Sequence, residues 1–192
     1  MRHRDIVSLV QGVLRGCEMP FAPRNPRTAA RRLGVQVVDW HFPDRISSLL
    51  VRPTIHGAVI YLNCRHQLTR QNWHLAHELG HYILHPVGVY ASTLGPGRLE
   101  REANIAATEI LMPEEAIRVA VARKGFEVPA LARMFGVSRE ALRLRLGELR
   151  SRSDLEGGSS HGVSRIPRSD RICGGSSRAV QGQRQETEDP QP

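Results

Sequence analysis

The chain has 192 residues, enough for one domain with a tail, and its 27 Lys and Arg against 19 Asp and Glu give a formal charge of +8. No apolar stretch reaches the roughly 18 residues that a membrane-spanning helix needs. A signal peptide is not expected, because a glutamine interrupts the short apolar run near the N-terminus and no small-residue cleavage site follows it. Cys17, Cys64 and Cys173 are odd in number and widely spaced, which excludes a disulfide framework and a cysteine zinc site. We therefore expect a cytoplasmic protein.

The last part of the chain, residues 151–192, differs in composition from the rest. It has six Arg and six acidic residues, 17 Gly, Ser or Pro, and no aromatic residue. Its apolar residues are isolated and follow no period, so the segment cannot bury enough surface to offset the entropy lost on ordering. We predict a folded domain over 1–150, which carries the whole net charge, and a disordered tail over 151–192.

Apolar periodicity predicts the elements of that domain in chain order. A short amphipathic helix over 5–15 is followed by a helix over 26–33, which Asn25 caps and Gly34 ends. Short β-branched or apolar runs separated by turn residues then predict three strands, over 35–40, 46–51 and 57–63. From about Thr69 the pattern is helical, with helices expected over 70–85, 97–111, 113–123, 129–135 and 138–150. This order predicts an α+β fold with a small three-stranded sheet.

The most informative motif is His77-Glu78-Leu79-Gly80-His81, an H-E-x-x-H sequence. On a helix, two histidines four residues apart project from the same face, so that both imidazoles reach one cation. Glu78 lies about 100° around the helix, where it can accept a proton from the water that attacks a substrate. The opposite side of this helix is apolar. We therefore predict His77 and His81 as metal ligands and Glu78 as the catalytic base.

A catalytic zinc ion needs a third protein ligand, and the following helix offers three glutamates. Glu100 shares a face with a small and apolar stripe that includes Ala103, and we expect this stripe to pack against the helix of the motif. Glu102 and Glu109 fall with Arg98 on the opposite face, which we expect to be solvated. A carboxylate buried among alanines is costly unless it is paired or coordinated. Glu100 is therefore the predicted third ligand, and Glu102 is the alternative. The spacing alone also admits manganese or iron, but two histidines and a glutamate favour Zn²⁺.

Four further residues are candidates for supporting roles around the metal. His85 continues the row of His77 and His81, and we expect it to support a ligand or lie at the surface rather than act as a fourth ligand. Asn104 lies on the face of the third ligand. His74, His85 and Tyr90 are near enough in sequence to be considered as second donors to an oxyanion.

Three blocks of the sequence together resemble the ImmA/IrrE family of zinc metallo-endopeptidases. They are RQNWHLAHELGHYILH at 70–85, EREANIAATEILMP at 100–113 and LARMFGVSREALRLRL at 131–146, and the resemblance covers about 26–150. It implies a zincin-like helical half, a cytoplasmic zinc endopeptidase, and Glu100 as the third zinc ligand. It also implies a helix-turn-helix transcriptional repressor, or an antitoxin-like regulator, as the protein substrate.

The segment 128–150 reads as a helix-turn-helix-like pair, with a turn at Gly136 and a second helix capped by Ser138. The second helix carries Arg139, Arg143, Arg145 and Arg150, and Arg139 and Arg143 are the candidates for contact with nucleic acid or a protein partner. The alternative, which we favour, is that both helices complete the peptidase fold and expose their arginines to solvent.

The sequence thus predicts a zinc-dependent endopeptidase that cleaves a helix-turn-helix regulator, with a role in transcription regulation and no membrane partner. The alternative function is a DNA- or repressor-binding module whose metal site is structural or vestigial. An intact Glu78 argues against this alternative, because a structural metal site has no use for a base beside the metal.

Overall fold

Helices and strands follow one another in the predicted order in the computed structural model, which describes residues 1–15, 25–52, 57–85, 90–91 and 97–156. The elements are α1 His3–Leu14, α2 Pro26–Arg32, β1 Gln36–Trp40, β2 Ser48–Val51, β3 Val59–Asn63, α3 Leu68–Leu84, β4 Tyr90–Ala91, α4 Arg98–Leu111, α5 Glu114–Lys124, α6 Val128–Phe135 and α7 Arg139–Glu156. The predicted α+β class is confirmed. Within the described ranges, no helix combines the length and the apolarity needed to cross a membrane.

Three of the predicted helix-boundary residues act as expected. The Asn25 side chain accepts a hydrogen bond from the Arg27 amide at 2.9 Å, which caps α2, and Gly34 follows this helix with a φ of 70°. The Ser138 hydroxyl accepts from the Ala141 amide at 3.0 Å at the start of α7. That helix continues to Glu156, six residues past its predicted end at Arg150. The predicted disordered tail otherwise falls on 157–192, which lie outside the described residues.

The sheet has the strand order β1-β3-β2-β4 in the described part of the chain. Strand β1 is parallel to β3, while β2 is antiparallel to both β3 and β4. The three predicted strands are present, and β4 is an addition. It is only two residues long and pairs with Leu49 and Leu50 of β2, so it is too short to show the alternation by which a strand is predicted.

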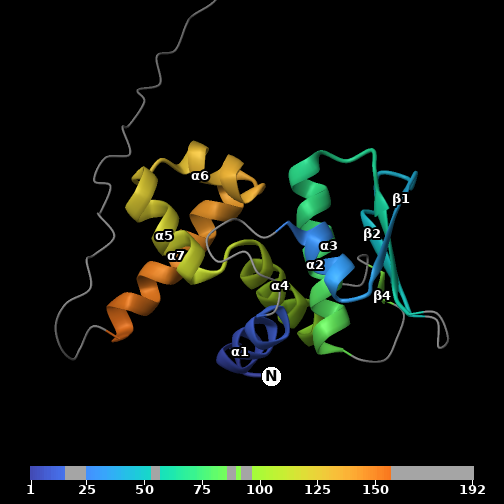
Figure 1. Cartoon of the computed structure of the whole chain (residues 1–192), viewed down its shortest axis with the longest axis horizontal. Coiled ribbons are helices and arrows are strands. Elements are labelled where there is room, and N and C mark those ends of the chain that lie inside the picture. The colour runs from blue at the N-terminus through green and yellow to red at the C-terminus, as the bar shows by residue number, and fades with distance from the viewer. Residues whose placement is uncertain (16–24, 53–56, 86–89, 92–96, 157–192) are drawn as a thin grey trace, which may run out of the picture. The chain divides into compact units, whose positions relative to one another are not determined.

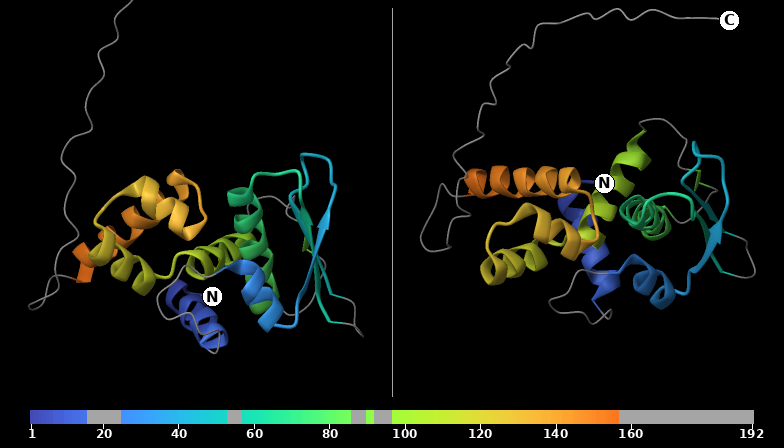
Figure 2. Two further views of the ribbon diagram at one scale, coloured as in Figure 1. Left: turned by 45° about the horizontal axis from the view of Figure 1, so that its top comes forward. Right: turned by 90° about the horizontal axis from the view of Figure 1, so that it is seen from above.

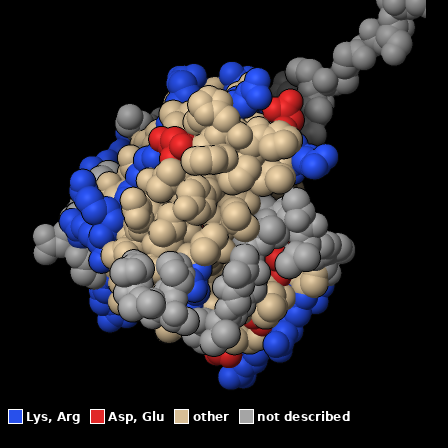
Figure 3. All heavy atoms as spheres, turned by 90° about the vertical axis from the view of Figure 1, so that its right-hand side faces the viewer, with Lys and Arg blue, Asp and Glu red and all other residues tan. Residues whose placement is uncertain are grey.

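Alternate residues of the sheet face its two sides. Leu50, Ile60 and Leu62 are buried on the inner side, against which α3 packs. The outer side carries Trp40 and Tyr61, whose rings meet edge to face with centroids 6.0 Å apart. Seen from this side, the described residues in the centre of the surface are mostly uncharged, and most of the arginines lie toward its edges (Figure 3).

Helices α3 and α4 cross in the centre of the domain, between the sheet and the group α5–α7 (Figures 1 and 2). Gly80 of α3 lies at the crossing. A Cβ atom placed there would come 2.8 Å from the Ala103 carbonyl oxygen and 3.0 Å from the Ala106 Cβ. Glycine on one helix and alanines on the other therefore allow the two backbones to approach closely. The expectation that the small stripe of α4 packs against the motif helix is confirmed.

The second expectation for α4, a solvated face with Glu102 and Glu109, is wrong. Glu102 is 5% exposed and Glu109 is 1% exposed. Helix α1 packs along this face and buries its own apolar stripe of Ile6, Val10 and Leu14. The helical wheel places the charged residues on one face, but it contains no information about the distant helix that covers them.

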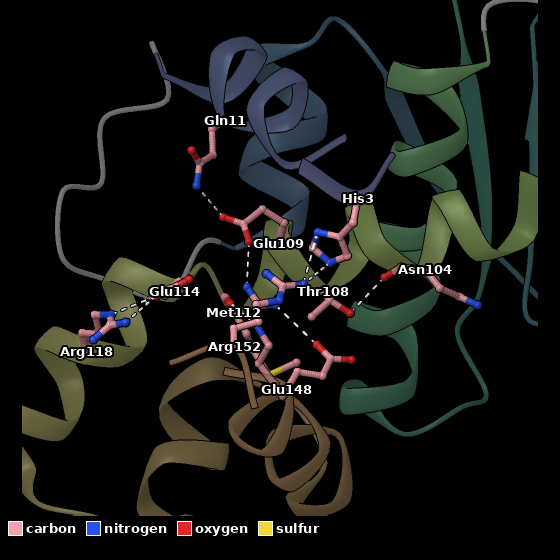
Figure 4. Close-up of polar contacts among 11 residues, drawn as sticks. His3, Gln11, Asn104, Thr108, Glu109, Met112, Glu114, Arg118, Glu148 and Arg152 are labelled. Carbon is pink, nitrogen blue, oxygen red and sulfur yellow. Dashed lines mark hydrogen bonds and ion pairs between the residues drawn. The ribbon is translucent and has the colours of Figure 1, made fainter. Parts of the chain in front are cut away.

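Glu109 forms a buried ion pair with Arg145 of α7. The Arg145 Nη2 atom lies 2.7 Å from Glu109 Oε2, and Nε donates to the Met112 carbonyl at 3.1 Å. Gln11 of α1 donates to the other Glu109 oxygen at 2.8 Å (Figure 4). The pair thus connects α1, α4 and α7. Arg145 is consequently unable to contact nucleic acid, in contrast to one interpretation of the arginine-rich helix.

We predict that Arg145→Met lowers the free energy of unfolding by about 3–5 kcal/mol, because it leaves the Glu109 carboxylate buried without its cation. The double variant Arg145→Met/Glu109→Leu should recover most of that loss, since it removes both charges. Arg143→Met, at an exposed position of the same helix, should change stability by less than about 0.5 kcal/mol. Urea unfolding of the three variants tests this, and equal losses in the single and double variants would contradict it.

Candidate metal centre

Three side chains from α3 and α4 converge on one point. His77 Nε2 lies 3.1 Å from His81 Nε2 and 3.1 Å from Glu100 Oε2, and His81 Nε2 lies 3.2 Å from Glu100 Oε1. His77 and His81 are buried, and Glu100 is partly buried on the first turn of α4. The structure therefore brings together the three residues that the sequence predicts as metal ligands.

The spacing of these atoms fits a metal ion of the size of zinc. Ligand atoms about 2.0–2.1 Å from a tetrahedral Zn²⁺ lie roughly 3.3 Å from one another. The observed separations of 3.1–3.2 Å need only a small expansion to reach this value. Three protein ligands also leave a fourth position for water or substrate, as in catalytic zinc sites.

Each ligand histidine has a partner on its other ring nitrogen. His77 Nδ1 lies 2.9 Å from Asn104 Oδ1, and an amide oxygen can only accept, so Nδ1 carries the proton and Nε2 is free to bind a metal. His81 Nδ1 lies 3.0 Å from His85 Nδ1, and His85 Nε2 lies 3.1 Å from Glu102 Oε2. The hydrogen bonds that link Glu102 to His85 and His85 to His81 orient the His81 ring in a similar manner, with Nε2 facing the converging group.

These contacts change the role expected for Glu102 and define the role of His85. Glu102, the alternative third ligand, is not part of the converging group. Its carboxylate contacts His85, the amino group of Met1 and, at 3.9 Å, Arg98, and the hydrogen bond from the amino group is the main reason why the pKa of Glu102 is lowered. Both ring nitrogens of His85 are used by His81 and Glu102. His85 is therefore placed to support a ligand and not to donate to an oxyanion.

The electrostatics of α3 favour neutral imidazoles. Burial, reinforced by the neighbouring His77, His85 and Arg52, lowers the pKa of His81 to about 3. A histidine that resists protonation keeps the lone pair that a metal needs.

Glu78 is fully buried beside the converging group. Ser48, on the inner side of β2, donates a hydrogen bond from its hydroxyl to Glu78 Oε1 at 2.7 Å. The second oxygen, Oε2, has no hydrogen-bond partner among the described residues. Burial raises the pKa of Glu78 to about 8, against the Ser48 hydrogen bond that lowers it, and the nearby Glu100 raises it further. One oxygen is thus held in place while the other can take part in proton transfer.

The remaining candidates are placed less directly. His74 lies one turn before His77 on α3 and is partly buried, and burial, with His77 and Arg70, lowers its pKa to about 4. Tyr90 contributes its backbone to β4, and its side chain lies outside the described residues. Arg139 and Arg143 are exposed on α7.

Two contacts of this centre were not predicted from the sequence. Ser48 carries a usable signal, because it is a polar residue at an inward position of a buried strand, in alternation with Leu50. The role of Glu102 has no local signal, since it depends on the angle at which α4 crosses α3.

The chain belongs to the family described as the IrrE N-terminal-like domain, Peptidase_M78, whose model matches residues 30–147. This match includes all three converging side chains, Glu78, and α6 with the first half of α7. The helix-turn-helix-like pair is thus part of the family domain. No curated protein matches the chain. The family is one of metallopeptidases, and the His77, His81 and Glu100 group is compatible with that class.

We predict that Glu78→Gln stabilises the metal-free protein, and that the gain grows with pH. The unfolded glutamate loses its proton near pH 4.5 and the folded one near pH 8. Between these values the folded state binds more protons, so wild-type stability falls as the pH rises. Glutamine removes this dependence, and the variant should be more stable by a few kcal/mol at pH 8 and about equal at pH 5.

Urea unfolding of the metal-free proteins at several pH values between 5 and 8.5 measures this difference. Glu115→Gln, at an exposed position of α5, is the control and should show no such trend. A difference between Glu78→Gln and wild type that does not change with pH would contradict the assignment of a raised pKa to Glu78.

Proposed function

We propose that the protein is a zinc-dependent endopeptidase that hydrolyses a peptide bond in a protein substrate. The observation that carries this proposal is the convergence of His77, His81 and Glu100 beside a buried Glu78 whose Oε2 has no hydrogen-bond partner among the described residues. A purely structural metal site would use neither an open fourth position nor a carboxylate with one oxygen left over.

Each residue of the candidate site has a distinct role in the proposed reaction. His77, His81 and Glu100 hold the ion, and a bound zinc ion supplies a Lewis acid that polarises a carbonyl oxygen and lowers the pKa of water. Glu78 has its raised pKa in the metal-free protein, and a cation bound beside it would favour the ionised form. The ionised Glu78 accepts a proton from the attacking water at Oε2 and returns it to the amine that leaves, while Ser48 fixes the other oxygen. Asn104 and His85 hold the two ligand rings in the orientation that presents Nε2.

We propose a helix-turn-helix regulator as the substrate, which would give the protein a role in transcription regulation in the cytoplasm. This proposal is supported by the resemblance of the three sequence blocks to the ImmA/IrrE endopeptidases, which implies such a substrate, together with the family match. Nucleic-acid binding is the second candidate function, and the exposed Arg139 and Arg143 favour it. It is the weaker candidate because Arg145 is buried in an ion pair and Arg150 stacks over the Phe126 ring at 4.8 Å.

We predict that Glu78→Gln lowers the rate of peptide hydrolysis by about 10²- to 10⁴-fold, the usual contribution of general acid–base catalysis, while zinc affinity changes less than about threefold. The assay uses zinc-loaded full-length protein with two kinds of probe: a proteome-derived peptide library and purified helix-turn-helix regulators from the same genome. Cleavage is read by mass spectrometry.

Glu115→Gln serves as the control and should cleave as wild type does. Undiminished cleavage by Glu78→Gln would show that the assigned mechanism is wrong. Cleavage of library peptides without cleavage of any regulator would retain the peptidase and remove the proposed substrate.

A further inference from the structure

A groove of about 920 Å³ lies between α7 and the helices α3 and α4. Its volume is within the usual range for ligand-binding pockets. Apolar side chains from three helices and from the turn before α7 form much of its lining: Trp73 of α3, Ile105 of α4, Met112 directly after α4, Val137 in the turn, and Ala141 and Leu144 of α7. At the end of the groove that lies away from the candidate metal centre, His3 of α1 and Arg152 of α7 contact each other, next to Thr108 of α4 (Figure 4).

The groove adjoins the candidate metal centre along both central helices. Trp73 precedes His77 by one turn of α3, about 5–6 Å along the axis. Glu100, Asn104 and Thr108 follow one another at single-turn intervals on one face of α4. Asn104 belongs to both sites, because it lines the groove and also contacts His77. A peptide bound in the groove would therefore lie within about one helical turn of the candidate metal centre.

The chemistry of the groove favours an apolar ligand. Among the lining residues in the described part of the chain, Arg145 is the buried charged one, and Glu109 already pairs with it. The other charged residues of the lining, Arg70, Glu140, Glu148 and Arg152, are not buried, so they offer a charged small molecule only partly or fully solvated anchors. Leu144 is 66% exposed in the groove wall, where it adds to the apolar surface that a bound ligand would cover.

We propose that this groove binds an apolar segment of the protein substrate and holds the adjoining peptide bond at His77, His81 and Glu100. This inference rests on the proposed function and deepens it. It assigns Leu144 and Trp73 as residues that determine which substrates bind, and it predicts a preference for apolar side chains a few residues from the cleaved bond. It also gives the helix-turn-helix-like pair a role in the peptidase, because α7 forms one wall of the groove.

The test compares Leu144→Arg with Leu9→Arg, which places the same charge at an exposed leucine of α1 outside the groove. The probe is the peptide from a proteome-derived library that zinc-loaded wild-type protein cleaves fastest. Leu144→Arg should raise KM at least tenfold with kcat and zinc content nearly unchanged, and Leu9→Arg should match wild type. Equal KM values in Leu144→Arg and wild type would overturn the proposal while leaving the peptidase in place.

Binding is measured separately from cleavage, so that the two proposals fail in different ways. Fluorescence anisotropy of labelled library peptides on the zinc-loaded Glu78→Gln protein should show apolar peptides binding, with a Kd at least tenfold higher when Leu144→Arg is added. If these peptides bind in this manner but wild type cleaves none of them, the groove is supported as a peptide site and the enzymatic function fails. If no peptide binds to the groove, this inference fails.

The occupant is identified by placing a benzophenone amino acid at position 144 of the full-length Glu78→Gln protein. Irradiation with saturating peptide should yield the protein–peptide adduct. A cross-link to a second copy of the protein, or to residues 157–192 of the same chain, would overturn the proposal and assign the groove to that occupant instead.

Discussion

The close crossing of α3 and α4 is the constraint on which the candidate site depends. Gly80 has no side chain, and Ala103 and Ala106 have small ones, so the helix axes come near enough for Glu100 to meet His77 and His81. A larger side chain at Gly80 would have to displace the backbone of α4 and would separate Glu100 from His77 and His81. Local helix geometry pairs the histidines, but only tertiary packing completes the site.

Polar groups buried around this crossing hold it in one arrangement. Glu102 orients His85 and thereby His81 on one side, while Glu109 and Arg145 join α4 to α7 on the other. A buried charge without its partner costs several kcal/mol, whereas a satisfied pair disfavours any alternative packing that would separate it. The helices α1 and α7 thus contribute to the candidate site, although its three converging side chains come from α3 and α4.

Much of the fold and the residues that converge at the candidate site could be predicted from the sequence, because both depend on local periodicity. Spacing of four residues places His77 and His81 on one face, and the small stripe on α4 points to Glu100. The burial of Glu102 and Glu109 could not be predicted, since three charged residues on one face of a helix normally indicate solvent and nothing local indicates that α1 covers them. The two-residue strand β4 and the extension of α7 to Glu156 are likewise set by contacts or by weak local patterns.

The proposed function depends most on a single zinc ion held by α3 and α4 together. Elemental analysis of purified wild type, His81→Ala and Glu100→Ala tests it directly, because each variant removes one ligand from a different helix. We predict close to one zinc ion per chain in the wild type, and loss of zinc in both variants while the fold, followed by circular dichroism, is kept. Wild-type protein that contains no metal and takes up no added zinc, or a Glu100→Ala variant that retains full zinc affinity, would contradict the account.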